Sequence, residues 1–468
     1  MAAPPAELPP DLNPSAPRAS FDGLPMEIKA RVVEHCAEHD EKWAKLRDHL
    51  EECVDAEERP PFKGAIKKTD VRRAFQAATE TYVPTIGALF RLSRLWSTLA
   101  APHRFKEVRT SQTDTLLFRH HIVQRRGHLF RKVWFDAHDT TILHNFVLIL
   151  PHFSAVTEAD VTDEGFGGYL DEASETDGLS WTALTDASPF GLATVFGRLT
   201  YLKTDITRTE DIVRLASAAP NLRALHLSEV AENDGGLTRI FEILPDLRDF
   251  VLKEADSELL RTLNNAMFAC GGQLFPPIAS LEVDVQDDLS EAMRFAQHFA
   301  PSLSTLTFNF TSKTRHDYPD DAVYPNLRSL RLEGQVDEIE ALMSCMKREQ
   351  FPAIVELVVC SDQLGVQMAP SMHEAVKNLG LEMQLLERVR IYDPRLCLVD
   401  HLLGRRPSQF RSKGSSVRYD LHRPSIKRTL DFLGEWFERA EGPGADGELA
   451  RLAKVLQQAE LERVARAF

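Results

Sequence analysis

The chain has few cysteines, no long apolar run and no excess of basic residues, and each shortage excludes a class of protein. Its 468 residues include six cysteines, none in a CxxC pair, so a disulfide framework is not expected. The longest apolar stretch, near 146–150, is far too short to cross a bilayer. The net charge is −15, whereas binding to nucleic acid requires a basic face. We therefore expect neither a membrane nor nucleic acid among the partners.

Signatures of catalysis and of secretion are missing as well. The sequence contains no nucleophile elbow, no GxxxxGK[ST] and no GxGxxG motif. His120 and His121 are adjacent and poorly placed to share a metal, and His373-Glu374 lacks the second histidine of a zinc-protease helix. The N-terminal residues are rich in proline and alanine and lack the apolar core of a signal peptide. We expect no enzyme activity, cofactor or metal, and a cytoplasmic or nuclear location.

What the chain does contain is a short apolar pattern that recurs along most of its length. An apolar residue is followed three positions later by a second, and two positions after that by a third, as in Leu222–Leu225–Leu227. The segments with this pattern start at Phe130, Phe153, Leu199, Leu222, Leu247, Ile278, Leu303, Leu327, Ile354 and Leu386. Those at Phe153 and Leu199 match at the first two positions only. Most starts are 23 to 32 residues apart, a period typical of a leucine-rich repeat solenoid.

Prolines divide the repeats into a helix and a strand. A proline precedes the apolar pattern at 220, 245, 301, 325 and 352, and a helix over 209–219 ends at the first of them. We predict an α/β fold of the ribonuclease-inhibitor type, with parallel strands on the concave face and helices on the convex face. The gap between Phe153 and Leu199 is about two periods long, so one degenerate repeat is expected near 179–184. The acidic run 163–177 in that gap reads as a solvated loop or, alternatively, as a docking tag for a basic partner.

The two ends of the chain do not follow the repeat. Helices are predicted over 24–36, 41–53, 69–82, 86–101, ending at Pro102, and 112–126, with Gly127 as the C-cap residue. Residues 403–420 appear irregular in pattern, and amphipathic helices over 424–440 and 446–467 would cap the solenoid. The predicted domains are a disordered tail over 1–20, a helical domain over 21–110 with an insertion at 37–83, the solenoid over 111–395, and a C-terminal segment over 396–468.

The strand pattern also predicts which side chains face a partner. Because alternate side chains of a strand point to opposite faces, the residues between the apolar positions belong to the concave surface. Glu282 and Asp284 make the middle of this surface acidic, and Arg388 with Arg390 makes its end basic, suited to an acidic or phosphorylated ligand. The candidate substrate-binding residues are Trp134, Tyr201, Lys203, His226, Arg331, Arg388, Arg390 and Tyr392.

Two N-terminal segments resemble the halves of an F-box. The sequence Leu24-Pro25-Met26-Glu27-Ile28 matches the L-P-x-E-[IL] opening of the family, and the segment from Leu92 to Ala100, followed by Pro102 and Phe105, is similar to its closing helix with a tryptophan. The chain therefore resembles fungal-type F-box proteins with leucine-rich repeats, although the insertion 37–83 roughly doubles the usual length of an F-box.

This resemblance implies a substrate-recognition subunit of a Skp–cullin–F-box ubiquitin ligase. It places Leu24, Pro25, Ile28 and Trp96 in or near the interface with a Skp-type adaptor, which links the chain to a cullin, and leaves the solenoid to bind an unidentified target protein. Outside that complex a monomer is expected. The main alternative is a free-standing repeat scaffold in which the N-terminal helices cap the first repeat. A further alternative is a GTPase activator that supplies an arginine finger.

Overall fold

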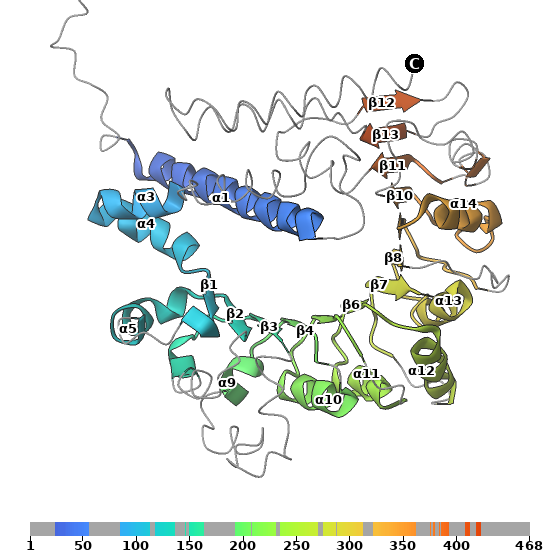
Figure 1. Cartoon of the computed structure of the whole chain (residues 1–468), viewed down its shortest axis with the longest axis horizontal. Helices are drawn as coiled ribbons and strands as arrows, with labels where there is room; N and C mark the ends of the chain where they lie inside the picture. Colours follow the sequence, from blue (N-terminus) through green and yellow to red (C-terminus); the bar gives the residue numbers. More distant parts are fainter. Residues whose placement is uncertain are drawn as a thin grey trace, which may run out of the picture. The chain divides into compact units, whose positions relative to one another are not determined.

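The structure is a computed structural model of the whole chain, shown in Figure 1. The residues it describes are 24–55, 85–112, 118–135, 146, 149–162, 192–206, 208–230, 235–269, 275–286, 288–311, 322–361, 375, 378–379, 383, 385–392, 408–411 and 418–422. The predicted tail, the helix over 69–82, the acidic run and the two C-terminal helices lie outside these residues. The chain divides into two compact units, one formed by Met1–Trp43 and Val83–Arg104 and the other by Ala44–Tyr82 and Phe105–Phe468.

The first unit is built from helices. Helix α1 runs without interruption over Met26–Asp55, where two separate helices were expected. The prediction was wrong because no proline or glycine lies between residues 36 and 53 to break the helix. Helices α3 (Thr85–Leu92) and α4 (Arg94–Arg104) follow.

The predicted single helix over 86–101 is in fact two helices that meet at Ser93. The hydroxyl of Ser93 accepts a hydrogen bond from the backbone N–H of Trp96 at 3.4 Å, which caps the start of α4. Pro102 does not end α4, which continues to Arg104. A proline this close to a C-terminus removes one backbone donor and leaves the rest of the helix intact.

The second unit is dominated by one sheet, which contains thirteen strands within the described residues. Strands β1 to β11 follow each other in chain order and pair in parallel. Their bounds are β1 Glu107–Arg109, β2 Lys132–Phe135, β3 Glu158–Val161, β4 Tyr201–Thr204, β5 Ala224–Leu227, β6 Asp249–Leu252, β7 Ser280–Val285, β8 Thr305–Phe310, β9 Ser329–Glu333, β10 Glu356–Cys360 and β11 Arg388–Tyr392. The predicted α/β fold is confirmed, and the parallel sheet is consistent with a leucine-rich repeat solenoid.

Helical segments connect successive strands and cover one side of the sheet. Helices α10 to α14 all lie on the outer side of the curved row of strands (Figure 1). Their bounds, with those of the shorter segments, are η2 Thr110–Gln112, η3 Phe118–Val123, α5 Gln124–Arg126, η4 Gly127–Leu129, η5 Leu150–His152, α9 Leu192–Phe196, α10 Thr209–Ala218, η6 Gly235–Thr238, α11 Arg239–Ile243, α12 Ser257–Ala269, α13 Leu289–Gln297 and α14 Val336–Cys345. The inner side of the sheet is therefore the concave face.

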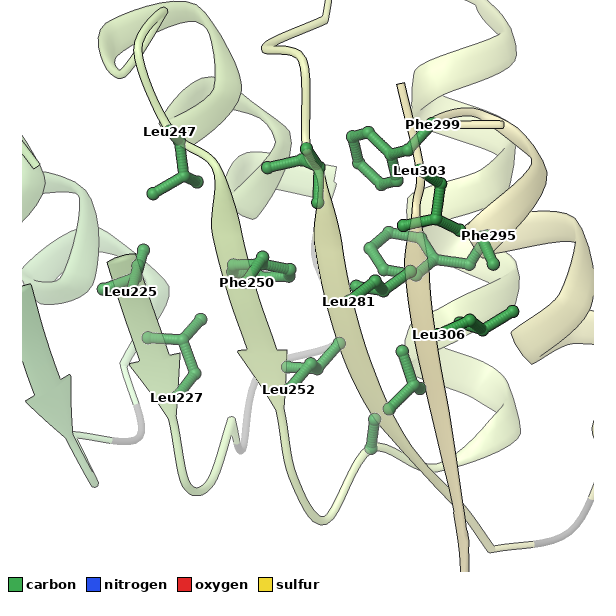
Figure 2. Packing of buried hydrophobic residues seen from close by; sticks show 14 of the residues in the cluster. Leu225, Leu227, Leu247, Phe250, Leu252, Leu281, Phe295, Phe299, Leu303 and Leu306 are labelled. Carbon is green, nitrogen blue, oxygen red and sulfur yellow. The ribbon is translucent and has the colours of Figure 1, made fainter. Parts of the chain in front are cut away.

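The core lies between the sheet and these helices. Leu225, Phe250, Leu281 and Leu306 occupy the second apolar position on four neighbouring strands and are almost completely buried. Figure 2 shows them in line, with Phe295 of α13 and Phe299, which follows that helix, among the side chains packed beside them. Phenylalanine rings also contact each other edge to face along the stack, for example Phe295 and Phe299 at 5.6 Å between centroids. Each repeat thus buries its apolar face against its neighbours.

The register of β3 corrects one predicted repeat. Ala159 pairs with Val133 and Val161 with Phe135, so the repeat starts at Val156 instead of Phe153. Strand β3 also pairs directly with β4. The degenerate repeat expected near 179–184 lies outside the described residues.

The sheet continues at both ends beyond the predicted pattern. At its start, β1 pairs with β2. At its end, the segment 403–420 is not irregular throughout, because β12 (Ser408–Arg411) and β13 (Arg418–His422) belong to the sheet. Strand β13 pairs in parallel with β11, and β12 pairs in antiparallel with β13.

Gly127 is the C-cap residue of α5, as predicted. Its backbone has φ −51°, which is ordinary helical geometry, so the cap is not left-handed. A Cβ atom at this position would lie 2.6 Å from the carbonyl oxygen of His152. Glycine is needed here because the backbone at residue 127 lies directly against the backbone of His152 in the next repeat.

Candidate functional site

The concave face carries two rows of side chains that cross the eleven parallel strands from β1 to β11. Strand register places the members of each row beside one another. The central row is Arg109, Trp134, Asp160, Lys203, His226, Val251, Glu282, Thr307, Arg331, Val358 and Arg390. The row beside it is Glu107, Lys132, Glu158, Tyr201, Ala224, Asp249, Ser280, Thr305, Ser329, Glu356 and Arg388.

Seven of the eight predicted substrate-binding residues lie in these two rows. The eighth, Tyr392, is the last residue of β11, and its backbone is in register with Cys360 of β10. Its side chain is not among the parts of the chain that the structure describes. The prediction omitted Arg109 and Asp160, which the register places on either side of Trp134. Asp160 was missed because the wrong start of the β3 repeat assigned no concave positions to that strand.

Trp134 is engaged by residues of its own chain. Its indole N–H donates a hydrogen bond to Oε2 of Glu107 at 3.1 Å. The guanidinium of Arg109 lies 4.7 Å from the ring centroid, and the ammonium of Lys132 lies 3.7 Å from it. Lys132 also forms an ion pair with Asp160 at 3.7 Å. These cation–π contacts use ring surface that a partner would otherwise cover.

Tyr201 and His226 form a second cluster on β4 and β5. The tyrosine hydroxyl lies 3.2 Å from Nδ1 of His226, and the two rings meet edge to face with centroids 4.8 Å apart. Burial, with the charges of Asp160 and Glu158, raises the pKa of Tyr201 to about 12. Burial and nearby lysines lower the pKa of His226 to about 4. Both side chains are therefore neutral at pH 7.

The middle of the concave face is acidic, and Lys253 neutralises part of this negative charge. Glu282 forms an ion pair with Lys253 at 3.7 Å. Burial and the charges of Glu333 and Asp284 raise its pKa, against the opposing effect of Lys253. Asp284 is 5% exposed and accepts a hydrogen bond at Oδ2 from the backbone N–H of Glu254 at 3.0 Å.

The arginines at the end of the sheet are already paired within the chain. Oε1 of Glu356 lies 2.7 Å from Arg390 and 3.6 Å from Arg388. Arg331 forms an ion pair with Glu333 on its own strand. The predicted basic end therefore contains carboxylates that occupy its guanidinium groups, and an acidic ligand would have to compete with them.

In the helical unit, the predicted adaptor-binding residues differ in exposure. Ile28 is 41% exposed, Pro25 is exposed and Leu24 is half-buried. Trp96 is 3% exposed and packs in a small core with Val33. The tryptophan is placed to support this unit from inside, and its side chain offers almost no surface to a partner.

Two further apolar side chains of this unit are exposed. Met26 at the start of α1 is 50% exposed, and Leu92 at the end of α3 is 66% exposed. Both lie within the two segments that resemble an F-box. The sequence contained this signal, since large apolar residues outside a buried helical stripe are candidates for a binding surface.

Asp40 links the two segments and was not predicted. Its carboxylate accepts hydrogen bonds from the backbone N–H groups of Thr85 at 3.0 Å and Ile86 at 2.8 Å. It thereby caps the N-terminus of α3 from a position on α1. Nothing in the local sequence indicates a cap whose acceptor is 45 residues away from its donor.

No protein-family model matches the chain, and no curated protein matches it in sequence. Within the described residues, no group of three or more His, Cys, Asp or Glu side chains is placed to hold a metal ion. A helix long and apolar enough to span a bilayer is likewise not found in that part of the chain.

Proposed function

We propose that the chain is the substrate-recognition subunit of a Skp–cullin–F-box ubiquitin ligase. The observation that carries the proposal is the packing of the two F-box-like segments in one helical unit. Val33 of the first segment's helix and Trp96 of the second belong to the same buried cluster. The long insertion between them therefore does not separate the two halves.

Exposed apolar side chains of this unit give the adaptor groups to bind. Met26, Ile28 and Leu92 are at least 41% exposed, and burying such side chains contributes about 1.5 to 3 kcal/mol each. The parallel sheet of the second unit supplies a long concave face for the target. The protein would act as a tether that raises the effective concentration of the target near the ubiquitin-loaded enzyme.

The test is capture of a purified Skp-type adaptor by the full chain. Ile28→Asp and Leu92→Asp introduce a charge at exposed positions, so the fold is expected to survive while adaptor binding is lost. Phe268→Asp is the matched control, because Phe268 on α12 is 84% exposed and lies outside the helical unit. Circular dichroism checks folding. Failure of the folded wild type to bind the adaptor would contradict the proposal.

A truncation separates this proposal from the free-standing scaffold. Removal of residues 1–104 leaves β1 in place, whereas a cut after residue 110 would also remove this strand from the sheet. A ligase subunit should lose the adaptor and keep a folded solenoid. A scaffold capped by its N-terminal helices should instead lose stability in the first repeats, measured by hydrogen exchange in β2 and β3.

A further inference from the structure

In the part of the concave face that the structure describes, Lys203 forms no close ion pair, although the charge of the neighbouring Asp160 acts on it. Among the described residues of this face, Lys132, Lys253 and the arginines at 331, 388 and 390 each form an ion pair with a carboxylate, and Arg109 lies against Trp134. Lys203 is exposed and makes no hydrogen bond or ion pair in the same part of the chain. It is in register with His226 on the next strand, so the two side chains are neighbours.

The hydroxyl of Tyr201 lies 3.2 Å from Nδ1 of His226, and which of the two groups donates depends on the tautomer of the imidazole. Binding of an anion requires the tautomer in which the hydroxyl donates, because Nδ1 is then unprotonated and the proton of the neutral imidazole is on Nε2. Nε2 has no partner among the described residues and is not one of the buried unpaired atoms. In this tautomer His226 presents an N–H donor to solvent beside the ammonium of Lys203.

The surroundings favour an anion at this pair. The charges that act on the imidazole are those of Lys253, Lys203 and Lys132, all positive. Glu158 and Asp249 lie in the adjacent row. Asp160 is in register with Lys203 and attracts it, but its carboxylate forms its close ion pair with Lys132. Two neighbours of His226 have short side chains, Ala224 on the same strand and Val251 in register on β6. They leave room for a ligand to approach the imidazole.

We propose that Lys203 and His226 bind the carboxylate of an acidic side chain in an extended segment of the target protein. One cation and one neutral N–H match a singly charged carboxylate, whereas a phosphate would require more positive charge. Tyr201 is a positioning residue that fixes the imidazole proton. The inference rests on the proposed function only in assigning the concave face to the target.

The experiment measures binding of a fluorescein-labelled decapeptide of alternating glutamate and serine by anisotropy. The wild type should bind it at low salt, although the chain itself has a net charge of −15. Lys203→Gln and His226→Leu should each weaken binding roughly tenfold, the typical value of a charge-assisted hydrogen bond. Lys347→Gln is the matched control, since Lys347 is an exposed lysine that follows α14, and it should bind like the wild type.

The tautomer gives a readout that a purely structural role of Tyr201 would not change. Nitrogen NMR of the wild type should show the proton of His226 on Nε2, and Tyr201→Phe should produce a mixture of tautomers together with weaker peptide binding. A proton on Nδ1 in the wild type would overturn the inference. So would unchanged peptide binding in Lys203→Gln, or a phosphoserine decapeptide that binds more than tenfold tighter than the glutamate one. Adaptor capture is measured separately, so its failure is distinguishable from failure of this site.

Discussion

Acidification should destabilise the sheet through His226, because its pKa is lowered from 6.5 to about 4 in the folded chain. Burial is the largest cause, and the charges of Lys253, Lys203 and Lys132 add to it. The unfolded chain therefore binds a proton at pH values where the folded chain does not. The contribution of His226 to stability is complete above pH 6.5 and is lost as the pH falls from there to about 4.

The size of the effect follows from the pKa. A fall from 6.5 to about 4 corresponds to about 3 kcal/mol, since one pKa unit is worth about 1.4 kcal/mol. The ring of His226 is half-buried, so solvent screening reduces the expected loss to about 1 to 2 kcal/mol. Such a loss is a sizeable fraction of the net stability of a folded domain, which is about 5 to 15 kcal/mol.

The assay compares urea unfolding of the wild type and His226→Phe at pH 7 and pH 4.5. Phenylalanine keeps an aromatic ring against Tyr201 and removes the titrating group. The wild type should lose about 1 to 2 kcal/mol more than the variant on acidification. His128→Phe is the control, because it removes an exposed histidine outside the concave face.

Three carboxyl groups on the same face have the opposite effect on the pH dependence of stability, because they favour the folded chain at low pH. Burial raises the pKa values of Asp160, Asp249 and Glu282, so their contribution to stability decreases as the pH rises above their ordinary values. These groups remain in both proteins, and their effect cancels in the comparison. An identical pH dependence of wild type and His226→Phe would refute the reasoning about the imidazole.

Four substitutions, one of them a control, test the packing that supports the two units. Gly334→Ala should lower the free energy of unfolding in urea by about 3 kcal/mol, because φ is 130° and a Cβ would lie 2.4 Å from the carbonyl oxygen of Phe310. The control is Gly87→Ala in helix α3, where the nearest atom to a Cβ is a side-chain nitrogen at 3.4 Å. This change should leave the stability unaltered or raise it slightly. Leu281→Ala should lower the free energy of unfolding by about 2 to 5 kcal/mol, since its side chain is completely buried. Asp40→Ala should cost about 1 kcal/mol and increase hydrogen exchange at the first two amides of α3, which its carboxylate caps.

The sequence predicted the strands wherever large apolar residues fill the repeat positions. Leu222–Leu225–Leu227 and Leu327–Leu330–Leu332 lie where the pattern placed them, because only the strand geometry buries all three side chains. The prediction was wrong at β3, where the small side chain of Ala159 occupies the second position. Thr204 stands at the third position of β4, is buried, and accepts the backbone N–H of Ile206 at its hydroxyl.

The concave residues were predictable, whereas their contacts were not. Alternation along a strand assigns a side chain to a face without knowledge of its neighbours. An ion pair such as Arg390 with Glu356 depends on which residues of two strands come into register. The distant cap by Asp40 depends on the packing of two helices. Both are properties of the assembled chain, so local sequence carries no signal for them.

Ion pairs between strands determine which charged groups of the concave face are available to a partner. From the sequence, Arg388 and Arg390 formed the most basic segment, but Glu356 neutralises much of their charge. A ligand gains little from a group that must first give up an internal partner, because the cost of breaking one ion pair offsets the gain from another. Recognition is therefore expected at cations that form no close ion pair within the described part of the chain, and on this argument Lys203 beside His226 is a better anchor for a target than the more numerous arginines.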